Sequence, residues 1–91
     1  MVAANDILQR RDEIRHFIAI NKLEQAIKRL MDFIKDFDEQ YQDDVILISM
    51  DYYDWKEEKE SGETQRSQIK MEKRRLAARI LDTMRFVLEK L

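Results

Sequence analysis

Hydrophobic residues recur at three- and four-residue steps along four segments of the chain, a spacing typical of amphipathic helices. The first predicted helix spans about residues 6–20. The second spans about residues 22–37, where the pattern is the most regular in the chain. Asn21 separates them, because asparagine tolerates the left-handed backbone that ends a helix. A short helical hairpin is therefore expected at the start of the chain.

Residues 45–48 are the one ambiguous stretch, because β-branched runs favour strands. A helix is the better interpretation, since no second strand candidate is present to pair with a lone strand. The pattern predicts a third helix over about residues 44–60. One face of this helix carries Val45, Ile48, Tyr52 and Trp55.

A polar loop is expected at residues 38–43, and Gly62 supplies the turn after the third helix. A fourth helix is predicted from about Thr64 to the C-terminus, with a hydrophobic stripe that begins at Ile69. Its first turns are almost wholly polar. We expect these turns to project beyond the core or to meet a partner.

These segments predict an all-α fold, a four-helix bundle built from two helical hairpins. The N-terminal hairpin is short and the C-terminal hairpin is long. The 91 residues suit a single domain, spanning residues 1–91. In this bundle Leu30 and Leu81 are expected to be buried.

The composition argues against most classes of chemistry. The chain has no cysteine, no proline, one glycine and one histidine, His16. Thiolate metal sites, disulfide scaffolds, multi-histidine metal sites and glycine-rich phosphate loops are therefore excluded. The serines lack the glycine-flanked turn of a nucleophile, and His16 is the only histidine able to act as a base. No enzyme activity, metal or cofactor is expected.

Carboxylates gather between residues 36 and 44 and suggest a calcium loop. Such a loop needs glycine at its sixth position and glutamate at its twelfth. Loops starting at Asp32, Asp36 or Asp38 have neither. The segment is interpreted as a solvated acidic loop.

The longest unbroken apolar runs are four residues each, whereas a membrane-spanning helix needs about twenty. No basic segment followed by a long apolar run marks a secretory signal at the start. The absence of cysteine is compatible with a reducing compartment. A cytoplasmic protein that does not enter a membrane is expected.

Charge is unevenly distributed, although the net charge is only −2. Residues 36–63 carry two basic and eleven acidic groups, whereas residues 64–91 carry eight basic and three acidic groups. An antiparallel third and fourth helix would set Lys73–Arg79 opposite Asp44–Asp54. Pairing within the chain is the favoured interpretation, and a charged protein partner is the second. Nucleic-acid binding is less favoured, because the basic run holds no aromatic residue and the whole chain is acidic.

Tyr52, Tyr53 and Trp55 lie close together among acidic residues, which repel phosphate. We expect Tyr52 and Trp55 to pack in the core and Tyr53 to lie at its rim. The alternative is a hot spot for protein contact. The candidate protein-interaction residues are Arg74, Arg75, Arg79, Asp51, Asp54 and Tyr53.

The order of several motifs is similar to that of a known family. Residues 14–30 place an arginine-bearing helix before a short break and a Leu-Glu-x-Ala-hydrophobic-x-x-Leu pattern. Residues 45–49 resemble the family's apolar start of a long third helix. Gly62, Arg74-Arg75-Leu76 and Ile80-Leu81 resemble its glycine turn and its later motifs. Through these residues the chain resembles the effector-associated domains of bacterial conflict and defence systems, subtype eleven.

This resemblance implies a small helical adaptor, analogous to death-fold modules, that couples sensor proteins to effectors by like-with-like association. The implied partner is a protein that carries a similar domain or an effector. Like-with-like association is also compatible with a homo-oligomer of this chain. Two alternatives remain open. One is nucleic-acid binding through the basic fourth helix, and the other is a purely structural helical oligomer.

Overall fold

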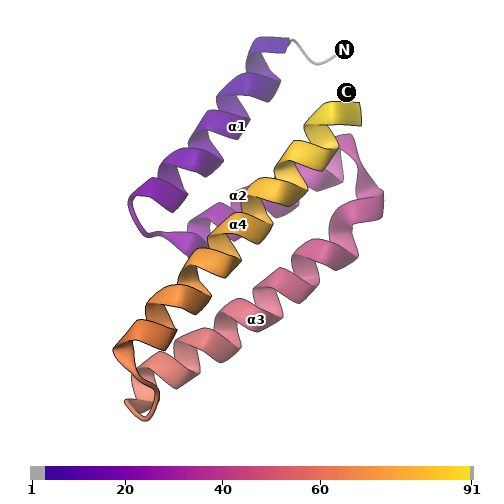
Figure 1. Ribbon diagram of the computed structural model, residues 1–91. Helices are drawn as coiled ribbons and strands as arrows, with labels where there is room; N and C mark the ends of the chain where they lie inside the picture. The colour runs from indigo at the N-terminus through magenta and orange to yellow at the C-terminus, as the bar shows by residue number, and fades with distance from the viewer. Residues whose placement is uncertain (1–3, 91) are drawn as a thin grey trace.

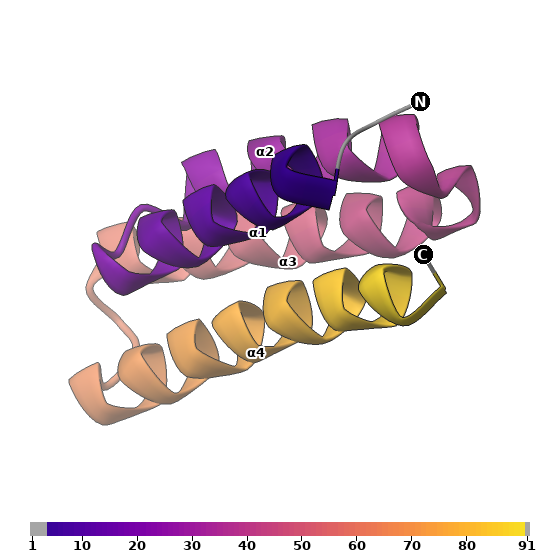
Figure 2. The ribbon, with the colours of Figure 1, turned by 90° about the horizontal axis from the view of Figure 1, so that it is seen from above.

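The structure is a computed structural model that describes residues 4–90. Within them, α-helices follow one another along the chain with a short 3₁₀ helix, η1, before the third. Successive helices run antiparallel along one long axis (Figure 1, Figure 2). The predicted all-α fold with four helices in a bundle is confirmed. The elements are α1 (Ala4–Ala19), α2 (Leu23–Phe37), η1 (Glu39–Tyr41), α3 (Gln42–Ser61) and α4 (Arg66–Lys90).

Both of the predicted helix breaks are present. Asn21 has φ 64° and Gly62 has φ 73°, so each adopts the left-handed conformation that ends a helix. At Asn21 the amide of Lys22 donates to the carbonyl of Phe17 at 2.8 Å, and the amide of Asn21 donates to that of Ile18 at 3.0 Å. This pair of hydrogen bonds is a Schellman motif, and it turns the chain directly from α1 into α2.

The segment between α2 and α3 differs from the predicted loop. Residues 39–41 form η1, and α3 begins at Gln42 rather than at residue 44. Asp43 and Asp44 lie in the first turn of α3, where carboxylates interact favourably with the exposed amides of a helix start. Polar residues that face solvent in a first turn give the same sequence pattern as a loop, which is why the prediction was wrong here.

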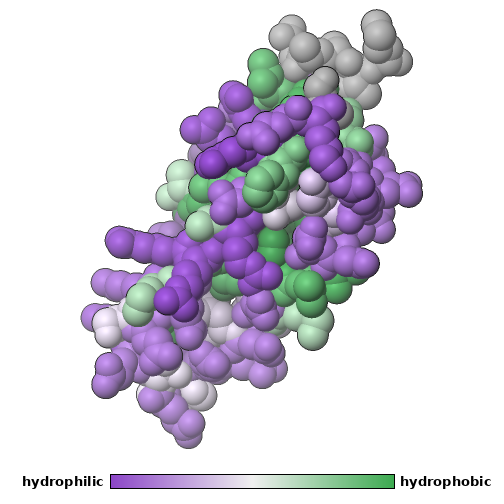
Figure 3. All heavy atoms as spheres, turned by 45° about the vertical axis from the view of Figure 1, so that its right-hand side comes forward, coloured by the Kyte–Doolittle hydropathy of each residue, from purple (hydrophilic) through white to green (hydrophobic). Residues whose placement is uncertain are grey.

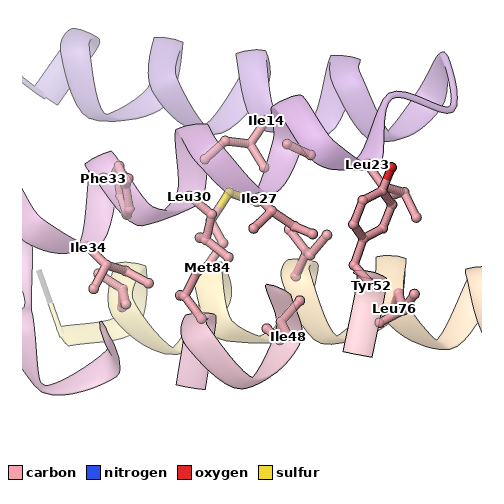
Figure 4. Close-up of a cluster of buried hydrophobic side chains, with 14 of the residues drawn as sticks. Ile14, Leu23, Ile27, Leu30, Phe33, Ile34, Ile48, Tyr52, Leu76 and Met84 are labelled. Atoms are coloured by element: carbon pink, nitrogen blue, oxygen red, sulfur yellow. The ribbon is translucent and has the colours of Figure 1, made fainter. Parts of the chain in front are cut away.

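α2 supplies the largest share of the core. It packs against α1, α3 and α4, and its inward side chains face those of the other helices (Figure 4). In α1, among the side chains that the structure describes, Ile14 alone is fully buried. The buried residues of α2 are Leu23, Ala26, Ile27, Leu30, Phe33 and Ile34. Those of α3 and α4 are Val45, Ile48, Tyr52, Trp55, Leu76, Ile80, Thr83, Met84 and Val87.

The two leucines predicted to be buried have different outcomes. Leu30 is fully buried. Leu81 is only partly buried and packs at the edge of the core, so that prediction was wrong. The reason is that α1 contacts α4 much less than it contacts α2, and this flank of α4 is left partly uncovered. Leu91, at the end of the predicted fourth helix, lies outside the described residues.

The polar start of α4 projects beyond the core, as one of the two interpretations expected. No residue of α3 after Trp55 is buried, and none of α4 before Leu76 is. Trp55 closes this end of the core, and its indole N–H donates to the carbonyl oxygen of Ile69 at 2.9 Å. α3 and α4 therefore extend past the α1–α2 turn as a two-helix tip (Figure 1).

Replacing Leu30 by alanine is expected to destabilise the fold by about 2–5 kcal/mol, because buried apolar area is lost and a cavity remains. Urea denaturation followed by circular dichroism measures this loss. Met50→Ala is the control, since Met50 is 58% exposed and its truncation should change the free energy of unfolding by less than about 0.5 kcal/mol. Equal losses in the two variants would contradict the described core.

Candidate protein-interaction surfaces

Acidic and basic side chains of α3 and α4 meet in a cleft along one flank of their contact. Arg79 of α4 forms an ion pair with Asp51 of α3. The antiparallel packing thus brings these two candidates together within one chain, as the favoured interpretation of the charges expected. We call this cleft the acidic cleft. It is lined by Asp51, Asp54, Trp55, Glu58, Glu72, Arg75, Leu76 and Arg79.

The acidic cleft holds more carboxylates than arginines. Repulsion from Glu72 raises the pKa of the Glu58 carboxyl, and desolvation and Asp54 add to the same shift. Arg75 and Arg79 therefore neutralise the cleft only in part. This side of the α3–α4 contact keeps an excess of negative charge.

Arg74 lies on the opposite flank of α4. It lines a cleft with Lys70 and Lys73 beside the α1–α2 turn. An adjoining cleft is lined by Lys73 together with Lys56 and Lys59 of α3. The candidate arginines are therefore divided between two flanks, because successive residues of a helix point about 100° apart. We call this second surface the basic flank.

The three aromatic residues of α3 are placed as predicted. Tyr52 and Trp55 are buried, and Tyr53 is 46% exposed at the rim. The Tyr53 hydroxyl donates to Oε1 of Glu24 on α2 at 3.2 Å. Burial, followed by the charge of Glu24, raises the pKa of the Tyr52 phenol.

Apolar side chains also cover part of the outer face of α3. Ile46, Leu47 and Met50 are 47%, 53% and 58% exposed, and we call them the α3 stripe. Phe86 of α4, 52% exposed, lines a shallow groove together with Leu47. Apolar side chains reach the surface between hydrophilic ones in Figure 3. The sequence pattern placed Val45 and Ile48 on one face with Tyr52 and Trp55, but it did not single out Ile46 and Leu47 as members of a contact surface.

A further groove lies between α1 and α4, on the flank where α4 is partly uncovered. Its charged lining residues are all arginines. Arg11 forms an ion pair with the neighbouring Asp12 at 2.9 Å, and Arg85 forms one with Asp82 at 3.9 Å. We call this surface the α1–α4 groove, and nothing in the sequence pattern pointed to it. It is lined by Arg11, Arg15, Leu81, Met84, Arg85 and Leu88.

Residues 4–90 contain no group of three or more histidine, cysteine, aspartate or glutamate side chains arranged to hold a metal ion. In the same part of the chain, no helix is both long and apolar enough to span a bilayer. His16 is exposed, with its ring 6.0 Å from that of Phe17. The features that the described residues offer to a partner are thus charged clefts and exposed apolar side chains.

Comparison with known proteins gives a family match. The family model described as effector-associated domain 11 matches residues 9–85. This region includes most of α1, all of α2 and α3, and α4 as far as Arg85. No curated protein and no solved structure matches the chain. The match agrees with the resemblance that the sequence motifs indicated.

Replacing Glu58 by glutamine is expected to stabilise the fold at neutral pH, because it removes the repulsion from Glu72. A raised pKa means that the folded state binds the proton more tightly than the unfolded state. The contribution of Glu58 to stability is therefore most favourable below the unfolded pKa, and it is lost as the pH rises through the raised pKa. Thermal unfolding should give a higher midpoint for Glu58→Gln than for the parent at neutral pH. The two midpoints should converge at about pH 3, where carboxylates are protonated.

Glu57→Gln is the matched control, since Glu57 is exposed and does not line the acidic cleft. Its midpoint should follow that of the parent more closely. A lower midpoint for Glu58→Gln at neutral pH would contradict the described repulsion.

Proposed function

Because this chain belongs to the effector-associated domain 11 family, we propose that it is a non-catalytic adaptor domain of bacterial defence or signalling systems. In this role it couples sensor and effector proteins by homotypic association. Its partner is a protein that carries a similar domain or an effector, or a second copy of the chain. The adaptor acts in the cytoplasm as one helical domain.

The observation that carries this proposal is the α3 stripe. Contiguous apolar side chains on the surface of a small protein mark interaction sites, because each exposed apolar area costs free energy in water. An apolar centre with a charged rim is the usual arrangement of a protein interface. Tyr53 and Asp54 of α3 border the stripe and supply part of that rim. Arg79 and Asp51 form an ion pair with each other, so they add little net charge to this rim.

A second candidate function is nucleic-acid binding, and the basic flank favours it. Five basic side chains from α3 and α4 gather there with one acidic side chain, Glu60, so phosphate contacts are available. The α3 stripe has no role in nucleic-acid binding. The basic residues are Lys56, Lys59, Lys70, Lys73 and Arg74.

If the chain associates with itself, its weight-average mass, measured by analytical ultracentrifugation, should rise between micromolar and millimolar concentration. The rise should be smaller in about 1 M salt than in about 0.1 M salt, because the screening length falls from about 10 Å to about 3 Å. Met50→Arg should abolish the rise by placing a charge in the stripe. Gln25→Arg, at an exposed position of α2, is the matched control and should associate like the parent. A parent chain that stays monomeric throughout would contradict homotypic association.

The nucleic-acid alternative predicts a different result, measured by fluorescence anisotropy with labelled DNA and RNA. An adaptor should show weak binding that does not depend on Lys70 and Arg74. Micromolar binding that falls steeply with salt, and that Lys70→Glu/Arg74→Glu abolishes, would favour the second function over the first.

A further inference from the structure

Two surfaces of this chain, on different helices, have matching form. Ile46, Leu47 and Met50 of the α3 stripe are exposed and project from one side of a helix. The α1–α4 groove is concave, and Met84, which is almost fully buried, lies at its floor. Leu81 and Leu88 are partly buried and form apolar walls. A helix that lays an apolar face into an apolar groove is a recurring mode of recognition.

The two surfaces also have opposite charge. From Gln42 to Trp55, α3 carries four aspartates and no basic residue. The charged side chains that line the α1–α4 groove are Arg11, Arg15 and Arg85. Within residues 4–90, Arg15 is exposed and makes no ion pair, so its charge is available to a partner. The groove thus suits an apolar helix with an acidic rim, and the chain itself contains one.

We propose that α3 of one copy docks with its stripe in the α1–α4 groove of a second copy. This inference rests on the homotypic association proposed above, and it names the two surfaces that meet. The apolar contact supplies most of the affinity. The aspartates of α3 and the arginines of the groove fix the orientation and speed the encounter more than they add affinity.

Docking of α3 against α3 of a second copy is the main alternative, and the charges disfavour it. In that arrangement Asp43 and Asp54 of one copy would approach the same acidic face of the other. Like charges brought together at an interface suppress the pairing. A partner surface of the opposite sign avoids this repulsion, and the α1–α4 groove supplies one.

The two surfaces share no residue. α1 packs against α2 and α4 rather than against α3, so one copy can use both surfaces at once. A contact between two different surfaces is heterologous, and it builds a ring where the rotation closes and an open filament where it does not. The inferred assembly therefore has more than two copies at high concentration.

Complementation between two variants tests this assignment. The stripe variant is Met50→Arg. If circular dichroism shows that this variant does not fold, Leu47→Arg takes its place. The groove variant is Arg15→Glu/Arg85→Glu, at two exposed positions. Each variant alone should be monomeric by sedimentation velocity, because the first places a charge in the apolar contact and the second sets glutamates against the aspartates of α3, a repulsion that opposes docking. An equal mixture should form a dimer of twice the monomer mass and nothing larger, because only one stripe and one groove remain intact.

Lys28→Glu/Lys35→Glu is the matched control for the groove variant, since it makes the same change of charge at exposed positions of α2. It should associate like the parent. A groove variant that still associates alone, or a mixture that stays monomeric while the parent associates, would overturn the docking and leave the homotypic function standing. A parent chain that is itself monomeric would overturn both.

Discussion

The apolar face of α2 is the part of this structure on which the other elements depend. It buries six side chains and packs against α1, α3 and α4. α1 uses its own apolar face mainly against α2, and it leaves one flank of α4 partly uncovered. α3 turns its buried residues toward α2 and α4, so the apolar residues left over from its Val45–Ile48 run lie on the outer face. The α3 stripe and the α1–α4 groove therefore both result from how the core is filled.

Charge pairing has a smaller part in holding the fold. Arg79 and Asp51 are each about half exposed, and exposed pairs of this kind contribute about 0–1 kcal/mol. The Arg10–Asp36 pair at 2.7 Å joins α1 to α2 in the same way, and the Arg10 guanidinium also lies over the ring of Phe33. Apolar burial carries most of the stability, so the fold does not depend on pairing every charge. Acidic side chains of α3 and α4 can therefore gather on one flank and basic side chains on the other. This sorting gives the domain surfaces of opposite sign despite a net charge of only −2.

The sequence was sufficient for the helices and for the two left-handed turns, because periodicity and the backbone preferences of asparagine and glycine act locally. It was also sufficient for the burial of Tyr52 and Trp55 and for a charge contact between the third and fourth helices. It was not sufficient for the half-burial of Leu81, because that depends on how far α1 lies from α4. For the same reason the α1–α4 groove had no signal in the sequence. The sequence also did not show that Arg74 and Arg75 lie on different flanks. That depends on how α4 is oriented about its own axis, and a run of basic residues does not determine this orientation.

In the assembly proposed above, two different surfaces of one chain meet when copies of it associate. Backbone amide resonances of the ¹⁵N-labelled chain, followed by NMR across a dilution series, test it most directly. We expect the amides of the α3 stripe and of the α1–α4 groove to shift together, with one common dependence on concentration, while those of the buried face of α2 stay unchanged. Shifts confined to one of the two surfaces, or centred on the basic flank, would contradict it.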